Sequence, residues 1–178
     1  PLFHPALKTV GPIRKNLAMR TFFNMLGPMA NPANPSYQLV GVYSLEMARI
    51  YNYLLQQTEK AFTIIHSLDG YDEISLTNDT KVITNEGERI MTPEQLGKRM
   101  VSAEDISGGN SVEKKKKIFT TILKGEATWA QNAVVLANAA MALHCTGNFK
   151  TYDDAYNAAV ESLESGKANQ SLQKLIST

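Results

Sequence analysis

A strand–helix–strand pattern between residues 37 and 67 constrains the fold more than any other feature. The segment "YQLVGVYS" is apolar and β-branched without polar alternation, which is typical of a strand buried on both faces of a parallel sheet. "KAFTIIHS" is a second buried strand. Between them, Ser44 suits an N-cap, and apolar residues follow at helical spacing, at Leu45, Ala48, Tyr51, Leu54 and Leu55. This order predicts a βαβ unit and an α/β fold class.

The segments before this unit predict helix and loop. Apolar residues spaced three and four apart predict a helix over residues 4–19, which Gly11-Pro12 weakens or kinks. Residues 22–26 predict a short buried helix. The following "GPMANPANP" predicts a stiff, irregular loop, because proline fixes φ and removes a backbone donor.

The segments after the βαβ unit change from strand to helix character. "EISLTNDTKVITNEGERIMT" predicts two or three antiparallel strands, with turns at "TNDT" and "NEGE". Residues 111–176 are expected to be helical almost throughout, with N-caps at Ser111 and Thr151 and a helix end at Gly166. The Ala-rich "WAQNAVVLANAAMALHC" predicts a buried central helix.

Composition narrows the function classes. The 178 residues suit one domain, or one large and one partial domain. A net charge of +1 implies no whole-chain attraction to nucleic acid or anionic membranes, and no apolar run approaches a membrane span of roughly 20 residues. The single Cys145 excludes an internal disulfide and fits a reducing compartment. The opening "PLFHPALK" lacks a starting Met, so we expect a piece of a longer protein.

Two adjacent acids, Asp72 and Glu73, follow the second buried strand. Adjacent carboxylates repel, and Mg²⁺ is the natural ion to hold them, since it takes one or two carboxylates and fills its other positions with water and phosphate oxygens. Ligands of α/β proteins bind at the carboxyl ends of strands, where this pair falls. A solvated acidic turn remains the alternative interpretation.

Other polar residues allow two interpretations each. Arg14 lies on the apolar face of its predicted helix and suits a carboxylate or phosphate, or else an internal salt bridge. His4, between Phe3 and Pro5, is more typical of a packed side chain than of a ligand. The lysines at 114–117 fit a solvated helix surface better than a nucleic-acid site, because no aromatic residues interleave them.

Four segments together resemble the anthranilate phosphoribosyltransferase family. They are "PLFHPALKTVGPIRKNLAMRTFFNMLGPMANPANP", "DGYDEISLT", "VVLANAAMAL" and "SLESGKA", and they extend over nearly the whole chain. The resemblance implies an α/β domain of the nucleoside phosphorylase and phosphoribosyltransferase type, here partial, with a C-terminal helical segment. It implies a cytoplasmic, homodimeric, Mg²⁺-dependent transferase of tryptophan biosynthesis, with no membrane or nucleic-acid partner. Such enzymes join anthranilate to phosphoribosyl pyrophosphate, which gives N-(5′-phosphoribosyl)anthranilate and pyrophosphate.

The resemblance also implies roles for particular residues. The acids that would bind Mg²⁺ at the pyrophosphate are Asp72 and Glu73. The positions that would contact anthranilate are Arg14 at its carboxylate, His4 and Leu7 along the channel for its ring, and Gly27 and Pro28 in the rigid loop beside that channel. We expect displacement at the ribose C1 with oxocarbenium character. No catalytic base is assigned, because the anthranilate amine is already a nucleophile.

The chain departs from the family in what it lacks. The "GTGGD"-type loop, the "KHGNR"-type segment and the small N-terminal helical domain do not occur. We therefore expect residues 1–178 to be the C-terminal portion of the large α/β domain, and the chain alone to be inactive or nearly so. The alternatives are a pyrimidine nucleoside phosphorylase-like enzyme and a nucleic-acid-binding paralogue of the same fold.

Overall fold

The computed structural model describes residues 5–17 and 26–177, which form two compact units, Pro1–Ser36 and Tyr37–Thr178. In the first unit, α1 (Ala6–Leu17) confirms the predicted helix and continues through Pro12. The predicted helix at 22–26 lies outside the described residues except for Leu26. That residue begins α2 (Leu26–Met29), so the loop predicted from Gly27 onward starts later than expected. Pro28 is tolerated because first-turn N–H groups have no intrahelical acceptor.

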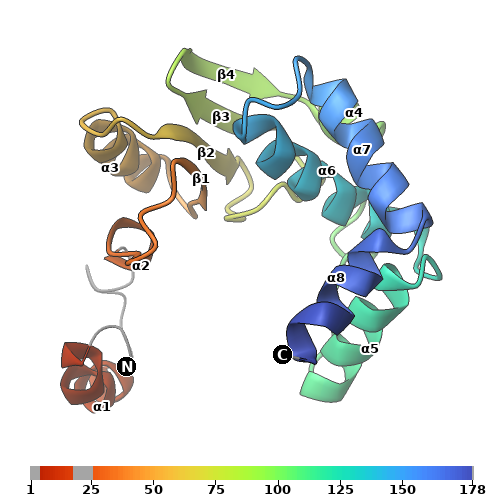
Figure 1. Ribbon diagram of the computed structural model, residues 1–178, viewed down its shortest axis with the longest axis horizontal. Coiled ribbons are helices and arrows are strands. Elements are labelled where there is room, and N and C mark those ends of the chain that lie inside the picture. The colour runs from red at the N-terminus through yellow and green to blue at the C-terminus, as the bar shows by residue number, and fades with distance from the viewer. Residues whose placement is uncertain (1–4, 18–25, 178) are drawn as a thin grey trace. The chain divides into compact units, whose positions relative to one another are not determined.

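The second unit contains a four-stranded sheet, ordered β1 (Tyr37–Gly41), β2 (Ala61–Ser67), β3 (Thr80–Thr84) and β4 (Gly87–Met91) (Figure 1). β1 and β2 are parallel, with Leu39 opposite Thr63, and α3 (Leu45–Leu55) connects them. The predicted βαβ unit is thus confirmed, and Ser44 caps α3 by accepting from the Met47 N–H at 3.3 Å. β3 and β4 form the antiparallel hairpin predicted around "NEGE".

The burial of the two parallel strands differs. Every residue of β2 from Phe62 to Ser67 is buried, as predicted. β1 is buried only in part: Val40 is buried, whereas Tyr37 is 52% exposed. The prediction for β1 was therefore wrong in degree, because within the described residues β1 is an edge strand with β2 as its one neighbour.

The segment "EISL" is not a strand, which corrects the sequence prediction. It belongs to residues 68–79, called here the acidic loop, between β2 and β3. Ile74 and Leu76 are fully buried, and Leu76 has a φ of 59°, which a strand does not allow. The apolar alternation therefore reflects burial of loop side chains against the core.

Five helices follow the sheet: α4 (Pro93–Gly97), α5 (Val112–Leu123), α6 (Trp129–Cys145), α7 (Tyr152–Glu164) and α8 (Lys167–Ile176). The caps at Ser111 and Thr151 and the left-handed Gly166 are confirmed, while the short α4 was not predicted. None of the helices described here has the length and apolar character needed to cross a membrane.

The core lies between the sheet and α6. Ala133, Ala137 and Ala140 are buried, so the helix backbone packs close to β1, β2 and α7. Ile65 belongs to this core, while the alternation along β2 directs Ile64 to the opposite face, where α3 packs on β2 and β3. α6 thus reaches the acidic loop through Asn138, and the thiol of its last residue, Cys145, donates to the Gln38 carbonyl near the start of β1 at 3.6 Å.

Candidate functional site

The acidic loop places Asp72 and Glu73 at the carboxyl ends of both parallel strands. The loop leaves β2 through a turn at Gly70, whose φ of 99° suits glycine. It then crosses the end of β1, where a Cβ added to Gly41 would lie 1.6 Å from the Asp72 carbonyl oxygen. A glycine at position 41 is therefore what lets the loop pass this close to the strand.

The backbone on both sides of Glu73 is held by side chains. The Ser67 hydroxyl donates to the Glu73 carbonyl at 2.7 Å. On the other side, the Ile74 N–H donates to Asn138 Oδ1 at 3.0 Å, and Asn138 Nδ2 donates to the Ile74 carbonyl at 2.9 Å. These bonds replace the ladder that a strand partner would supply, so the loop has a defined path without being a strand.

A cavity of about 450 Å³ opens beside this loop. Its apolar wall comes from Leu39 and Ile65 of the sheet and from Val134 and Val135 of α6. Asp72, Glu73 and Asn138 supply its polar wall, and Gly41 completes it. The arrangement combines two carboxylates with an apolar wall at the carboxyl ends of parallel strands, where α/β proteins bind ligands.

The two carboxylates are exposed, and within the described residues neither takes part in an ion pair or a side-chain hydrogen bond. No group of three or more potential metal-ligating side chains occurs among those residues. Two free carboxylates on a fixed backbone suit Mg²⁺, which needs one or two protein carboxylates and takes its other ligands from water and phosphate. The acidic pair therefore has the donor set for a magnesium–phosphate site.

The other predicted site residues belong to the first unit. Positions 7 and 14 lie two turns apart in α1, and Gly27 and Pro28 lie in α2. His4 lies outside the described residues. The roles predicted for these five positions and for the acidic pair stay predictions.

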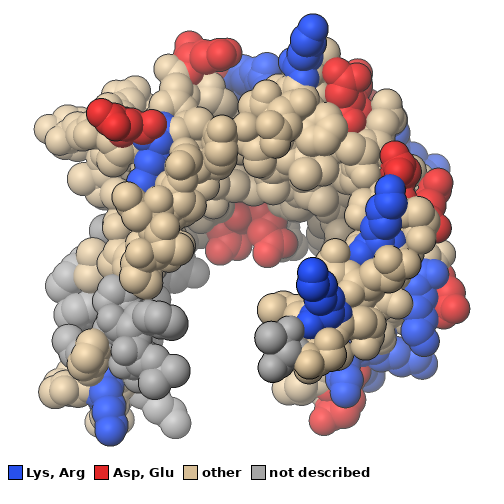
Figure 2. Space-filling view, in the orientation of Figure 1, with Lys and Arg blue, Asp and Glu red and all other residues tan. Residues whose placement is uncertain are grey.

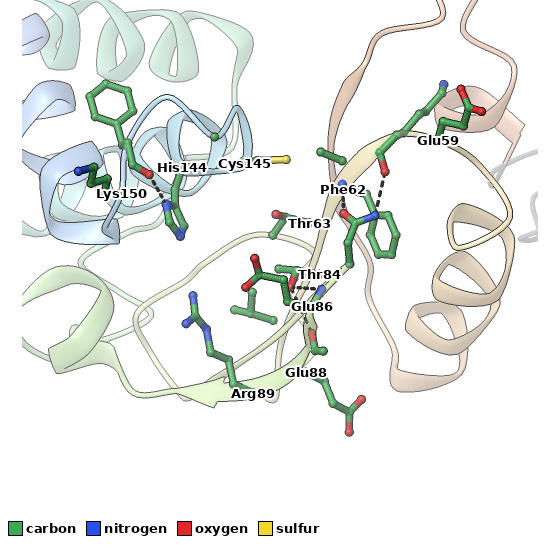
Figure 3. A pocket seen from close by; sticks show the side chains of 17 residues that line it. Glu59, Phe62, Thr63, Thr84, Glu86, Glu88, Arg89, His144, Cys145 and Lys150 are labelled. Atoms are coloured by element: carbon green, nitrogen blue, oxygen red, sulfur yellow. Dashed lines mark hydrogen bonds between the residues drawn. The ribbon is translucent and has the colours of Figure 1, made fainter.

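A larger cavity of about 830 Å³ lies at the opposite end of β2, near the start of that strand and the end of α6 (Figure 3). The charges on its wall balance: Lys60, Arg89 and Lys150 are matched by Glu59, Glu86 and Glu88. Glu88 also pairs with Lys81 at 2.8 Å. This balance does not favour a polyanion, so the smaller cavity beside the acidic pair is the better candidate despite its size.

The lysines of α5 form part of a mixed charged surface. Lys114–Lys117 are exposed. In Figure 2, the Lys and Arg side chains around α5, α7 and α8 lie beside Asp and Glu side chains. This distribution fits a solvated helix surface rather than a uniform basic face for nucleic acid.

Two site residues were missed from the sequence, namely Gly41 and Asn138. Each had a weak local signal. Gly41 interrupts an otherwise β-branched strand, which often marks a close backbone approach. Asn138 is a polar residue inside the Ala-rich apolar helix, where a buried amide must find partners.

Comparisons with known proteins identify the family of the chain. Residues 1–169 match the model of the glycosyl transferase family, a/b domain. The chain is 57% identical over 175 residues to an anthranilate phosphoribosyltransferase of Christiangramia forsetii, and 51% identical over 176 residues to one of Bacteroides fragilis. These matches cover 98% and 99% of this chain but 53% of each relative, so the chain spans about half the length of the curated relatives it matches.

Solved structures show the same fold. The anthranilate phosphoribosyltransferase of Thermus thermophilus superposes with a TM-score of 0.88 at 28% identity, over 98% of this chain and 52% of that one. The Saccharomyces cerevisiae enzyme, in complex with PRPP and Mg, gives a TM-score of 0.85 at 24% identity, over 96% of this chain and 49% of that one. The α/β fold and the resemblance drawn from the sequence are confirmed, and the chain belongs to the glycosyl transferase family, a/b domain.

Proposed function

We propose that this chain forms the metal-binding part of an anthranilate phosphoribosyltransferase, which transfers the phosphoribosyl group of phosphoribosyl pyrophosphate to anthranilate in tryptophan biosynthesis. The observation that carries the proposal is that the carboxylates of Asp72 and Glu73, which form no ion pair within the described residues, lie beside a cavity at the carboxyl ends of β1 and β2. The names of relatives at 51–57% identity support the substrates. The Saccharomyces cerevisiae complex, at 24% identity, supports only the fold, and the two carboxylates support Mg²⁺ binding.

In this proposal the chain binds and orients both substrates. Asp72 and Glu73 hold Mg²⁺, which stabilises the negative charge of the departing pyrophosphate when it is bound. Arg14 receives the anthranilate carboxylate in a two-point hydrogen bond. His4, Leu7, Gly27 and Pro28 border the aromatic ring. The amine attacks the ribose C1 without a general base, so orientation supplies a large share of the rate.

The assembly of the whole enzyme is also part of the proposal. We assign residues 1–178 to the large α/β domain of a cytoplasmic homodimer. Because the chain spans about half of its relatives, we assign the remaining phosphoribosyl pyrophosphate contacts and the small helical domain to sequence outside these 178 residues.

A chimera tests the proposal. This chain replaces the matching 175 residues of the Christiangramia forsetii relative, and loss of anthranilate fluorescence is followed with phosphoribosyl pyrophosphate and Mg²⁺. The double variant Asp72→Asn/Glu73→Gln should lose activity by on the order of 100-fold or more at fixed Mg²⁺, because developing charge on pyrophosphate goes unbalanced. Its folding should not change, since both side chains are exposed.

The matched control is Asp153→Asn/Asp154→Asn, which removes a second adjacent and exposed acid pair at the start of α7. The control should keep its Mg²⁺ dependence. A folded chimera that consumes no anthranilate contradicts the proposal, and phosphorolysis of thymidine by that chimera would instead support the nucleoside phosphorylase alternative.

A further inference from the structure

We propose that Asn138 of α6 is a positioning residue of the metal site, which fixes the acidic loop in the path that Mg²⁺ binding requires. The inference rests on the metal site of the proposed function and deepens it. Asn138 has no charge to offer the ion. It acts through the backbone of Ile74, which directly follows Glu73.

All the hydrogen-bonding groups of the Asn138 side chain are used. Its Oδ1 accepts from the Ile74 N–H at 3.0 Å, and its Nδ2 donates to the Ile74 carbonyl at 2.9 Å. The second Nδ2 donor reaches the Val134 carbonyl at 2.9 Å, one turn earlier in α6. The bond to Val134 fixes the orientation of the amide plane, and the pair of bonds to Ile74 transfers that orientation to the loop.

These three hydrogen bonds, called here the clamp, hold the backbone directly after Glu73. Ser67 holds the Glu73 carbonyl from the sheet side at 2.7 Å, and Asn138 holds the next peptide group from the helix side. Ile74 is fully buried, so water cannot replace Asn138 as the hydrogen-bond partner of its backbone groups. Without the amide, two polar groups of Ile74 lose their partners and the backbone beside Glu73 is free to shift.

Space filling alone does not explain the choice of asparagine. Its helical neighbours, Ala137 and Met141, are buried and apolar, and a side chain there could fill space without an amide. Asn138 also lines the 450 Å³ cavity together with Asp72 and Glu73, so the amide lies at the site itself. Groups that orient metal ligands without touching the metal typically change metal affinity about 10- to 100-fold when they are removed.

The test measures Mn²⁺ binding to the 178-residue chain by the loss of the free-ion signal in electron paramagnetic resonance. Asn138→Ala and Asn138→Leu are compared with wild type. Leucine keeps the branched side chain with the same number of non-hydrogen atoms and removes all three hydrogen bonds. A packing defect is therefore restored by leucine, whereas the lost hydrogen bonds are not. Asn132→Ala is the matched control, because it makes the same truncation on the same helix. Within the described residues, the Asn132 side chain forms no hydrogen bond with the acidic loop.

We expect the Mn²⁺ dissociation constant to rise about 10-fold or more in both Asn138 variants and to stay unchanged in the control. In the metal-free chain, amide exchange at Ile74 should accelerate in the same two variants, because Asn138 Oδ1 is its acceptor. Equal Mn²⁺ affinity of wild type and both variants overturns the inference, as does recovery of affinity by leucine. Failure of wild type itself to bind Mn²⁺ overturns the metal site of the proposed function, and the inference with it.

Discussion

Replacing Gly41 with alanine should perturb the proposed metal site through a single methyl group. The added Cβ would lie 1.6 Å from the Asp72 carbonyl oxygen and 2.8 Å from its carbonyl carbon, whereas real Cβ contacts do not fall below 3.0 Å. Strand and loop must therefore separate by about 1.4 Å, the difference between the 3.0 Å limit and the 1.6 Å separation from the carbonyl oxygen. The neighbour is backbone, so no side-chain rotation can relieve the clash.

The consequence should appear in function more than in folding. Overpacking of this kind costs about 1–3 kcal/mol of stability. A displacement of about 1 Å at a reacting centre costs on the order of 100-fold in rate. We therefore expect the chimera carrying Gly41→Ala to remain folded, to need a higher Mg²⁺ concentration for half-maximal activity, and to lose on the order of 100-fold in kcat/KM.

The assay is a Mg²⁺ titration of anthranilate consumption, together with urea unfolding to measure the stability loss. Gly108→Ala is the matched control, because a Cβ there meets nothing within 4 Å and the residue is exposed. An unchanged Mg²⁺ requirement in a Gly41→Ala enzyme would refute the reasoning, since it would mean that the position of Asp72 does not matter for the metal.

Two further predictions concern other parts of the chain. Arg14→Ala in the chimera should raise the KM for anthranilate by roughly 10- to 100-fold without changing the Mg²⁺ requirement. Arg14→Lys should not restore the KM, because lysine lacks the two-point geometry. An unchanged KM would show that Arg14 does not contact anthranilate. Tyr152→Phe should destabilise the chain by about 1–2 kcal/mol, because the single hydrogen of the buried hydroxyl is shared between the Leu96 carbonyl at 2.7 Å and the Ala137 carbonyl at 3.1 Å. Burial raises the pKa of Tyr152 above its ordinary value of 10.0, and nearby Tyr156 and Asp153 raise it further. The stability that the neutral phenol contributes is therefore complete below pH 10.0 and is lost as the pH rises through the raised pKa. Urea midpoints should therefore show the advantage of wild type over Tyr152→Phe narrowing above pH 10.0, and an advantage that stays constant would contradict this explanation.

The sequence predicts what depends on local patterns. The βαβ unit follows from runs of apolar residues at known periods, and the caps at Ser44, Ser111 and Thr151 follow from side chains that bond within three residues. The position of Asp72 and Glu73 beyond the end of β2 also follows, because only a short turn, residues 68–71, separates them from Ser67. Their role as metal ligands, like the roles of the first-unit residues, stays a prediction.

The sequence does not predict what depends on distant partners. "EISL" has the alternation of a strand, but the backbone groups of its Ile74 bond to an amide 64 residues away. Nothing local marks Asn138 as that partner. Likewise, the glycine at position 41 is explained only when the chain returns over β1 after 31 further positions, at Asp72.

If Asp72 and Glu73 bind Mg²⁺ as proposed, the clamp between Asn138 and Ile74 links metal affinity to the folding of the second unit. The carboxylates of Asp72 and Glu73 are neighbours in any conformation, but the path of the loop between them and β3 exists only when α6 has docked on the sheet. Ligand that binds only the native state stabilises that state in proportion to the logarithm of its concentration. A rise in unfolding temperature with added Mg²⁺ would then show that α6 has docked on the sheet. An unfolding temperature that no longer depends on Mg²⁺ would show that α6 has undocked, even in a chain that keeps its helices.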